Sequence, residues 1–263
     1  MRFAQTNGGV AHFADEGPRQ APAVVFINSL GTDFRIWDDV AAPLARQRRV
    51  IRFDKRGHGL STHAAPVATI ADFAADLAGL LDHLRSGPAT VVGLSIGGMI
   101  AQELYRLRPD LVAALVLSDT GHKIGTAELW KTRISAVEAG GIEAIGEAVM
   151  QRWFTEDYRR QYTEMMAGWR AMLTRTPKDG YLAACRAIRD ADLTEGAKRI
   201  RVATLVIVGD QDASTPPDLA HEMAALIPGA KLEIVAGAGH LPCIEKPERV
   251  RALIERHLGE VAS

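Results

Sequence analysis

Six short runs of apolar residues recur along the chain, and each is rich in β-branched side chains. The runs are Ala23–Asn28, Val50–Asp54, Thr90–Gly93, Ala113–Ser118, Thr204–Gly209 and Leu232–Val235. Because apolar residues follow one another without regular polar alternation, each run suits a strand that is buried on both faces, as in a parallel sheet. The pattern therefore predicts a central, mostly parallel β-sheet.

The first residues of the chain follow a different pattern. Arg2–Thr6 and Val10–Asp15 flank the tripeptide Asn7-Gly8-Gly9. Asn and Gly tolerate the positive φ angles of a tight turn, so this arrangement is typical of a β-hairpin. We expect two antiparallel strands at an edge of the sheet.

Apolar residues at helical spacing separate the strand-like runs. The clearest set comprises Ile70, Phe73, Leu77, Leu80, Leu81 and Leu84. Such spacing places the apolar side chains on one side of a helix. Strands that alternate with helices of this kind predict an α/β fold.

The alternation stops between residues 121 and 196. Aromatic and methionine side chains, among them Trp130, Trp153 and Trp169, lie there among helix formers, with no strand-like run. We therefore expect a helical cap at 121–196 and an α/β core formed by 1–120 and 197–263. An insertion at the carboxyl end of a parallel strand lies where such sheets bind ligands. Packing within the cap explains any single Trp or Met equally well.

Composition narrows the class of partner. The chain of 263 residues is 47% hydrophobic and 24% charged, with a formal net charge of −1. Such a balance gives no long-range attraction to nucleic acid or to anionic membranes, so a small molecule is the expected partner. The two cysteines, Cys185 and Cys243, lack the spacing of a disulfide framework or a zinc site.

The chain also lacks obvious targeting signals. The first nine residues do not form the apolar core of a signal peptide, and no segment has the roughly 20 apolar residues of a membrane-spanning helix. We expect a cytoplasmic protein that does not associate with membranes.

One motif predicts a catalytic residue, and the strand before it and the helix after it make the match specific. Thr90–Gly93 reads as a strand and the residues after Ser95 as a helix, with Gly93-Leu94-Ser95-Ile96-Gly97 at the junction. A serine at such a sharp turn needs glycine two residues away on each side, because a Cβ atom there would meet neighbouring backbone. Ser95 is therefore the predicted nucleophile.

A nucleophilic serine also needs donors for the oxyanion that its attack creates. The helix that follows Ser95 directs free N–H groups toward the site, which makes the Ile96 amide one expected donor. The second donor is expected from the loop after Ala23–Asn28, where Gly31 permits an exposed amide. We assign this second donor to the Leu30 N–H.

The serine further requires a base and a group that orients the base. His240 follows the strand-like run Leu232–Val235 in a glycine-rich loop, and Thr204–Gly209 leads into a loop with Asp210 and Asp212. Asp212 is preferred as the orienting acid because it lies deeper in its loop, whereas Asp210 suits backbone hydrogen bonds within the turn. His58, His63 and His122 remain loop alternatives for the base.

Other chemistries find no support in the pattern. No His-x-x-x-His pair lies on a predicted helix, and no Cys/His cluster occurs. The Gly93–Gly98 segment has neither the P-loop nor the dinucleotide spacing. We expect neither a metal nor a cofactor.

With these residues identified, the chain resembles the α/β-hydrolase superfamily, and more narrowly the bacterial 3-oxoadipate enol-lactonases of aromatic catabolism, the β-ketoadipate pathway. The stretches that carry the resemblance are Phe26–Thr32, Phe53–Ser61, Gly93–Gln102, Ser118–Thr120, Gly209–Pro216 and Gly237–His240. Asn28-Ser29 is the most telling part, since most members of the superfamily have His-Gly there. The serine at position 95 separates the chain from relatives that use aspartate, the haloalkane dehalogenases and epoxide hydrolases.

The resemblance implies a Ser95, Asp212 and His240 triad that hydrolyses 3-oxoadipate enol-lactone to 3-oxoadipate. A small anionic lactone calls for a cation in its pocket. Arg133, with Lys131 beside it, is the candidate, although a solvated surface role fits equally well. Trp130 and Trp153 are candidate pocket residues.

Rival functions remain open at this stage. Carboxylesterases, cofactor-free perhydrolases and carbon–carbon bond hydrolases share the same triad, so fold and triad do not separate them. A ligand receptor on the same fold is a further alternative, and it would bind its ligand but turn it over very slowly.

Overall fold

The computed structural model describes residues 2–62 and 69–262, in which eight strands form one sheet. The strands are β1 (Arg2–Thr6), β2 (Gly9–Glu16), β3 (Ala23–Ile27), β4 (Arg49–Phe53), β5 (Ala89–Leu94), β6 (Val112–Ser118), β7 (Ala203–Gly209) and β8 (Lys231–Val235). Their spatial order is β1-β2-β4-β3-β5-β6-β7-β8. All six predicted runs and the hairpin are present, with ends within one residue of the predicted bounds.

The sheet is parallel from β4 to β8 and antiparallel only at its first edge. β1 pairs with β2, and β2 with β4, in antiparallel register. β3, β4 and β5 are buried throughout, as their apolar runs predict. β8 is the exception. It lies at the other edge of the sheet, where Ile234 is 45% exposed, so the prediction of burial on both faces was wrong for this strand.

Twelve α-helices surround the sheet in the described part of the chain. They are α1 (Asp38–Leu44), α2 (Ile70–Leu84), α3 (Ile96–Leu107), α4 (Ala127–Gly140), α5 (Gly146–Trp153), α6 (Glu156–Gln161), α7 (Thr163–Thr174), α8 (Lys178–Asp190), α9 (Thr194–Ala197), α10 (Pro217–Leu226), α11 (Pro242–Glu245) and α12 (Pro247–Ala262). Short 3₁₀ helices occur at Phe34–Trp37, Pro109–Leu111 and Ile142–Ile145.

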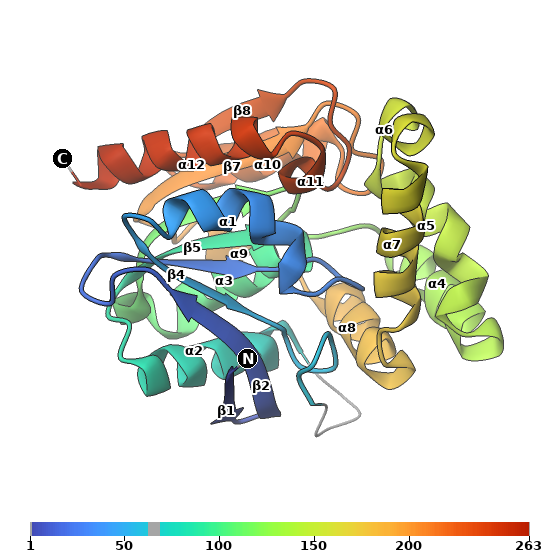
Figure 1. Ribbon diagram of the computed structural model, residues 1–263, viewed down its shortest axis with the longest axis horizontal. Helices are drawn as coiled ribbons and strands as arrows, with labels where there is room; N and C mark the ends of the chain where they lie inside the picture. The colour runs from blue at the N-terminus through green and yellow to red at the C-terminus, as the bar shows by residue number, and fades with distance from the viewer. Residues whose placement is uncertain (1, 63–68, 263) are drawn as a thin grey trace.

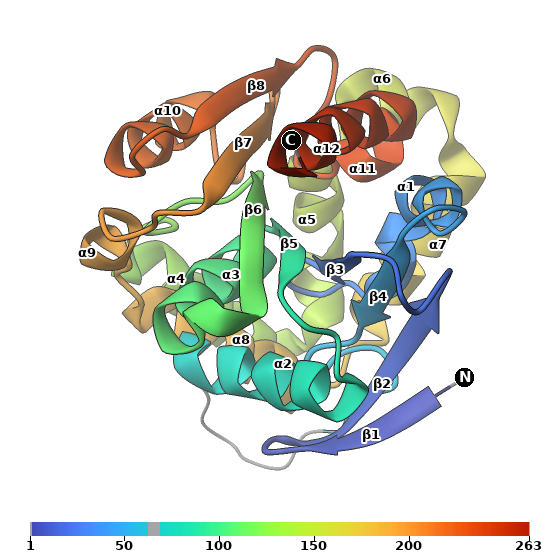
Figure 2. The same ribbon diagram turned by 90° about the vertical axis from the view of Figure 1, so that its left-hand side faces the viewer.

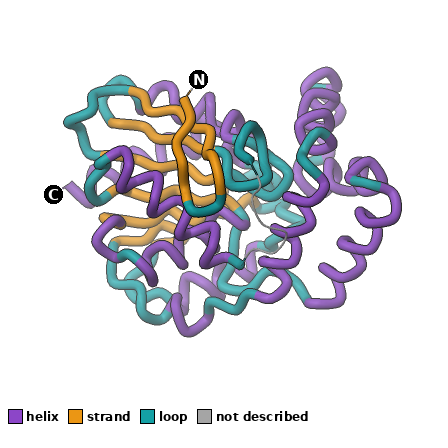
Figure 3. The backbone as a smooth tube through the Cα atoms, turned by 90° about the horizontal axis from the view of Figure 1, so that it is seen from below, coloured by secondary structure: helices purple, strands orange, loops and turns teal. Residues whose placement is uncertain are grey.

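The helices divide into two layers and one separate group. α1 and α12 pack together on one face of the sheet, and α2, α3, α9 and α10 cover the other (Figure 2). α4 to α7 form a group beyond the end of the sheet, as Figure 1 shows at its right-hand side. Figure 3 shows that this group contains helices and loops without a strand. The helical nature of this region is as expected, whereas the boundaries of the cap as a domain stay a prediction.

The chain order explains why functional side chains can gather at one edge. In parallel strands the carboxyl ends lie at the same edge of the sheet, and the loops after β3, β5, β6, β7 and β8 all leave there. Among the described residues, no helix combines the length and the apolar character needed to cross a membrane.

Candidate active site

Ser95 lies in a strained turn between β5 and α3. Its φ angle is 58° and its ψ angle −120°, in a region that non-glycine residues rarely adopt. A Cβ atom on Gly93 would lie 2.2 Å from the Gly97 carbonyl oxygen, and one on Gly97 would lie 2.5 Å from the Ile27 carbonyl oxygen. Both glycines are therefore required by the close approach of backbone on either side of the serine.

The neighbouring strand holds this strained turn in place. The Ser95 N–H donates to the Ser118 carbonyl oxygen at 3.0 Å, and the Thr120 hydroxyl donates to the Ser95 carbonyl oxygen at 2.6 Å. The Ser95 side chain makes no capping hydrogen bond to α3. The main chain of Ser95 is thus fixed, while its hydroxyl faces a cavity that Ser95 and His240 both line.

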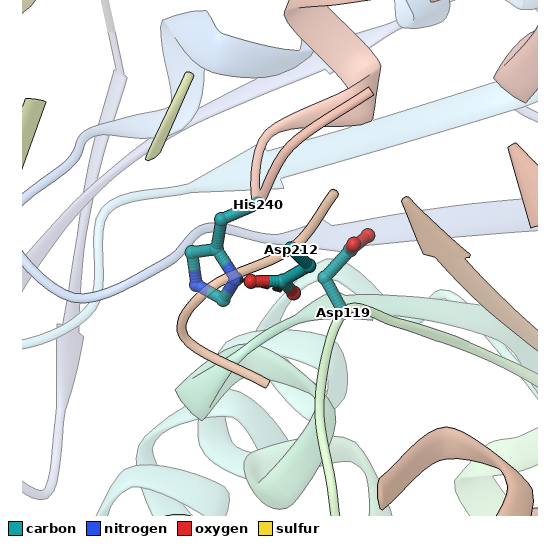
Figure 4. A group of neighbouring side chains, drawn as sticks. All are labelled: Asp119, Asp212 and His240. Carbon is teal, nitrogen blue, oxygen red and sulfur yellow. Dashed lines mark hydrogen bonds and ion pairs between the residues drawn. The ribbon is translucent and has the colours of Figure 1, made fainter. Parts of the chain in front are cut away.

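Asp212 and His240 form a buried pair. Asp212 Oδ2 lies 2.8 Å from His240 Nδ1, and the two side chains are 0% and 3% exposed (Figure 4). The Thr215 hydroxyl donates to Asp212 Oδ2, and the backbone N–H groups of Ser214 and Thr215 donate to Oδ1. Burial opposes ionisation, yet the charge and hydrogen bond of His240 together with the Thr215 donors hold the pKa of Asp212 below its usual value.

This pairing leaves His240 Nε2 as the nitrogen available to the cavity. The hydrogen bonds of the described residues do not include one between the Ser95 hydroxyl and His240. In ligand-free enzymes such contacts are often long and tighten when substrate binds. The arrangement supplies a serine hydroxyl and an oriented imidazole on one cavity, which are the groups that acyl transfer requires.

The other sequence candidates lie elsewhere. Asp210 Oδ1 accepts the backbone N–H groups of Gly237 and Ala238, at 2.8 Å and 3.3 Å, so it joins the two loops and does not contact His240. Neither His58 nor His122 lines the cavity. His63 lies outside the described residues.

Asp119, which the sequence reasoning missed, lies beside Asp212. It follows β6 with a positive φ of 46°, is fully buried, and accepts the Gly209 N–H at 2.9 Å and the Ser118 hydroxyl at 2.6 Å. Burial, reinforced by repulsion from Asp212, raises the pKa of Asp119 well above its usual value. In Figure 4 the Asp212 carboxyl lies between His240 and Asp119.

Asp119, Asp212 and His240 are also side chains of the types that bind metals. One potential ligand atom from each lies within 4.8 Å of the others, a spacing that one ion can span. Protein donors already use these oxygens, since Asp212 accepts from His240, Ser214 and Thr215 and Asp119 accepts from Gly209. Protein donors therefore occupy these oxygens, and within the group Asp212 is the residue that orients His240.

The loop after β3 lines the same cavity as Ser95. The Asn28 amide N–H donates to the Thr32 carbonyl oxygen, and the Thr32 hydroxyl donates to the Ser29 carbonyl oxygen at 2.9 Å. Gly31 has a φ of 73°, which permits the reversal of the chain at this point. Leu30 lines the cavity, and its N–H makes no hydrogen bond within the described residues. The Ile96 N–H is the first of α3 and has no partner within the helix.

The cavity itself is small and has two unlike walls. Its volume is about 130 Å³. The core wall consists of Ser29, Leu30, Ser95, Ala213, Ser214, Thr215 and His240, and the helical wall of Ile124, Gly125, Leu129, Trp130, Arg133, Val149, Arg152, Trp153 and Tyr181. No Asp or Glu lines the cavity among the described residues, so its fixed charge is positive. A compact anion fits this volume and charge.

Two arginines supply the positive charge. The Arg133 guanidinium lies over the Trp130 ring, 5.0 Å from its centroid, and its charge acts on the buried Tyr181 hydroxyl. Arg152 is half-buried, and burial followed by repulsion from Arg133 lowers its pKa. Neither arginine forms a salt bridge with a carboxylate of the described residues. Two close, unpaired cations are unfavourable unless a ligand anion joins them.

The sequence candidates on the helical wall have mixed outcomes. Arg133, Trp130 and Trp153 all line the cavity, and the Trp130 indole donates to the Ile124 carbonyl oxygen at 2.7 Å. Lys131 does not line it: its side chain is 63% exposed and lies 3.9 Å from Glu128. Arg152 was missed because Val149, Met150 and Trp153 mark the buried face of α5, whereas nothing in the sequence shows that the charged residue beside this face borders the cavity.

Glu245 connects the loop of His240 to the helical wall. One carboxylate oxygen accepts the Gly239 N–H at 2.6 Å, and the other accepts the backbone N–H and the hydroxyl of Thr155, at 3.0 Å and 2.7 Å. The Leu241 N–H also donates to the Trp153 carbonyl oxygen at 3.3 Å. The segment that carries the imidazole is therefore bonded directly to the helices above it.

Known proteins resemble this chain in sequence and fold. The chain is 34% identical over 233 residues to 3-oxoadipate enol-lactonase 1 of Acinetobacter baylyi, an alignment that covers 89% of this chain and 87% of the relative. It is similar to the crystal structure of the enol-lactonase from Burkholderia xenovorans LB400, with a TM-score of 0.94, 35% identity, and coverage of 98% and 100% of the two chains. It is also similar to a thermophilic esterase from Thermogutta terrifontis with malate bound, with a TM-score of 0.93, 31% identity and full coverage of both chains.

Residues 24–253 match the family model described as the alpha/beta hydrolase family. The match spans most of the chain and includes the strands and loops that carry Ser95, Asp212 and His240. This protein therefore belongs to the alpha/beta hydrolase family and is a hydrolase.

Proposed function

We propose that the protein hydrolyses 3-oxoadipate enol-lactone to 3-oxoadipate, as a step in the bacterial degradation of aromatic compounds. The observation that carries the proposal is the charge of the cavity: Ser95 and His240 face two unpaired arginines, and no described acidic residue lines the space. The proposed substrate is a five-membered lactone with an acetate arm, which matches a small cavity with a cationic side. The enol-lactonase relatives support the same choice.

In the proposed reaction, Ser95 Oγ attacks the ring carbonyl while His240 Nε2 accepts the hydroxyl proton. Asp212 keeps the imidazole in the required tautomer and stabilises its charged form. The Leu30 and Ile96 N–H groups stabilise the oxyanion. The ring C–O bond then breaks, and the departing enolate oxygen takes the proton back from His240 to give an enol, which tautomerises to the ketone. An enolate is a better leaving group than an alkoxide, so this step demands less of His240 as an acid.

The second half of the proposed reaction releases the product. His240 activates a water molecule that attacks the acyl group on Ser95, and the serine leaves with the proton returned by the imidazole. The product has two carboxylates. One stays with Arg133 and Arg152, and the new one arises beside Ser95.

A neutral-ester hydrolase is the second candidate, supported by the thermophilic esterase among the similar structures. The arginines distinguish the two candidates. A neutral ester does not compensate two guanidinium groups on the cavity wall, whereas a carboxylate does.

The test follows the loss of ultraviolet absorbance of 3-oxoadipate enol-lactone with the wild-type protein, with Ser95→Ala and with Ser214→Ala. Ser214 is a second serine on the same cavity and is the matched control. We expect rapid turnover by the wild type, a loss of about 10³- to 10⁶-fold in Ser95→Ala, and little change in Ser214→Ala.

p-Nitrophenyl acetate, a neutral ester, completes the experiment. If only this ester is hydrolysed, and Ser95 is required, the protein is an esterase and the lactone proposal is wrong. If neither compound is turned over, a receptor role replaces the enzymatic one.

A further inference from the structure

Lys55 is a buried cation that takes no part in the steps of the proposed reaction. It follows β4, its residue is 1% exposed, and its ammonium donates to the Ser29 carbonyl oxygen at 2.5 Å. Ion pairs normally accompany a buried lysine, because an uncompensated charge is costly in the interior. No salt bridge joins Lys55 to a carboxylate among the described residues.

The Ser29 carbonyl oxygen, which accepts from Lys55, belongs to the peptide group of the proposed oxyanion site. The Ser29 carbonyl and the Leu30 N–H are the two ends of one peptide bond, and the Leu30 N–H is the proposed oxyanion donor. The Thr32 hydroxyl donates to the same carbonyl oxygen at 2.9 Å. A cation at the oxygen end polarises the peptide and makes its N–H a stronger donor, since chains of hydrogen bonds reinforce one another in a medium of low polarity.

The acidic groups near Lys55 have other partners. Asp54 accepts from His12 Nδ1 and from the backbone N–H groups of Phe34 and Leu60, and Asp33 pairs with Arg35. Burial lowers the pKa of Lys55 to about 7, while the charges of Asp54 and Asp33 act in the opposite direction. The charge of the ammonium group that contacts the Ser29 carbonyl oxygen is therefore sensitive to pH near neutrality.

We propose that Lys55 is a positioning residue of the oxyanion site: its ammonium fixes the Ser29–Leu30 peptide with the N–H toward the cavity and strengthens that N–H as a donor. The inference rests on the proposed attack by Ser95. It extends the oxyanion site from two backbone amides to a side chain behind one of them, and it makes this backbone donor accessible to mutagenesis.

The test compares Lys55→Met and Lys55→Gln with the wild type, using p-nitrophenyl acetate so that the cavity arginines do not enter the result. Methionine fills the space without a donor, whereas glutamine retains an uncharged N–H. Lys198→Met, which removes an exposed lysine, is the control. We expect kcat to fall about 30-fold in Lys55→Met and less in Lys55→Gln, with KM changed little and the melting temperature maintained.

Two further readouts separate an oxyanion role from general support of the loop. A boronic acid that adds to Ser95 places an oxygen in the oxyanion site, so its affinity should fall in parallel with kcat in Lys55→Met. Succinate, which probes only the cationic side of the cavity, should bind equally well. The ratio of wild-type to Lys55→Met kcat should decrease as the pH rises from 6 to 9, because the lysine loses its proton in this range.

Three results would count against the inference. Wild-type kcat in Lys55→Met, with hydrolysis still dependent on Ser95, would overturn it and leave the proposed function intact. Equal losses of boronic acid and succinate affinity, with a kcat ratio that does not vary with pH, would assign Lys55 to general support of the fold. Absence of any Ser95-dependent turnover in the wild type would remove the proposed function and the inference together.

Discussion

The two walls of the cavity differ in how their polar groups are held. Behind the core wall, Asp212 accepts four hydrogen bonds from protein donors, and the Ser95 main chain is bonded to β6 and to the loop after it. On the helical wall, Arg133 and Arg152 have no carboxylate partner among the described residues. Under the proposed function, the groups that perform chemistry are fixed before substrate arrives, whereas the groups that recognise the ligand keep their charge available for it.

Substitutions that disturb the groups holding the core wall should have the largest effect, and the two aspartates of the loop after β7 test this directly. Asp212→Asn should lower kcat by about 10²- to 10⁴-fold, because asparagine favours the wrong tautomer of His240. Asp210→Asn should change kcat by less than about tenfold, since Asp210 contacts only backbone N–H groups. Steady-state kinetics on either substrate measure both, and the reverse order would show that Asp210 orients the imidazole.

Substitutions on the helical wall should affect binding of the anion and leave the chemical step intact. Arg133→Met and Arg152→Met should each raise KM for the lactone by about 10- to 100-fold, the contribution of a charge-assisted hydrogen bond. KM for p-nitrophenyl acetate should not rise. Lys131→Met is the control, because Lys131 is exposed and away from the cavity. Equal effects on the charged and the neutral substrate would show that the arginines support the wall and do not recognise the carboxylate.

Asp119 should give the smallest effect although it is close to the reacting groups. Its raised pKa means that the neutral acid persists to higher pH than in water, and asparagine reproduces that neutral form. Asp119→Asn should retain kcat within about threefold at pH 6, where the wild-type acid is most protonated. A kcat profile from pH 6 to 9 measures this. A loss of 100-fold at pH 6 would show that the reaction needs a charged Asp119.

The fold could be predicted well because its signals are local. A buried parallel strand such as β5 is a continuous apolar run, and α2 shows a clear helical period from Ile70 to Leu84. β8 illustrates the limit. Its apolar residues resemble those of the central strands, but the position of a strand within the sheet depends on the chain order, so the exposure of Ile234 was not foreseen.

The site was predictable where a motif constrains the backbone and unpredictable where only three-dimensional contact matters. Gly93 and Gly97 indicate the strained turn at Ser95, since no other residue fits beside it. Asp119 and Lys55 lie in stretches that carry the family resemblance, but no pattern there assigns them a role, and Arg152 has no signal of this kind. Each is a common charged residue whose neighbours come from distant parts of the chain.

Glu245 links the loop of His240 to the helical wall, so a movement of the helices would affect the position of the imidazole. The same carboxylate holds the Gly239 N–H, next to His240, and Thr155 on the helical side. If the helices move away to release product, they must either break these bonds or carry the imidazole with them. Under the proposed function, product departure and realignment of His240 for the next turnover would then occur in the same movement. Burial raises the pKa of Glu245, so acid protonates it earlier than an exposed glutamate and loosens this linkage first.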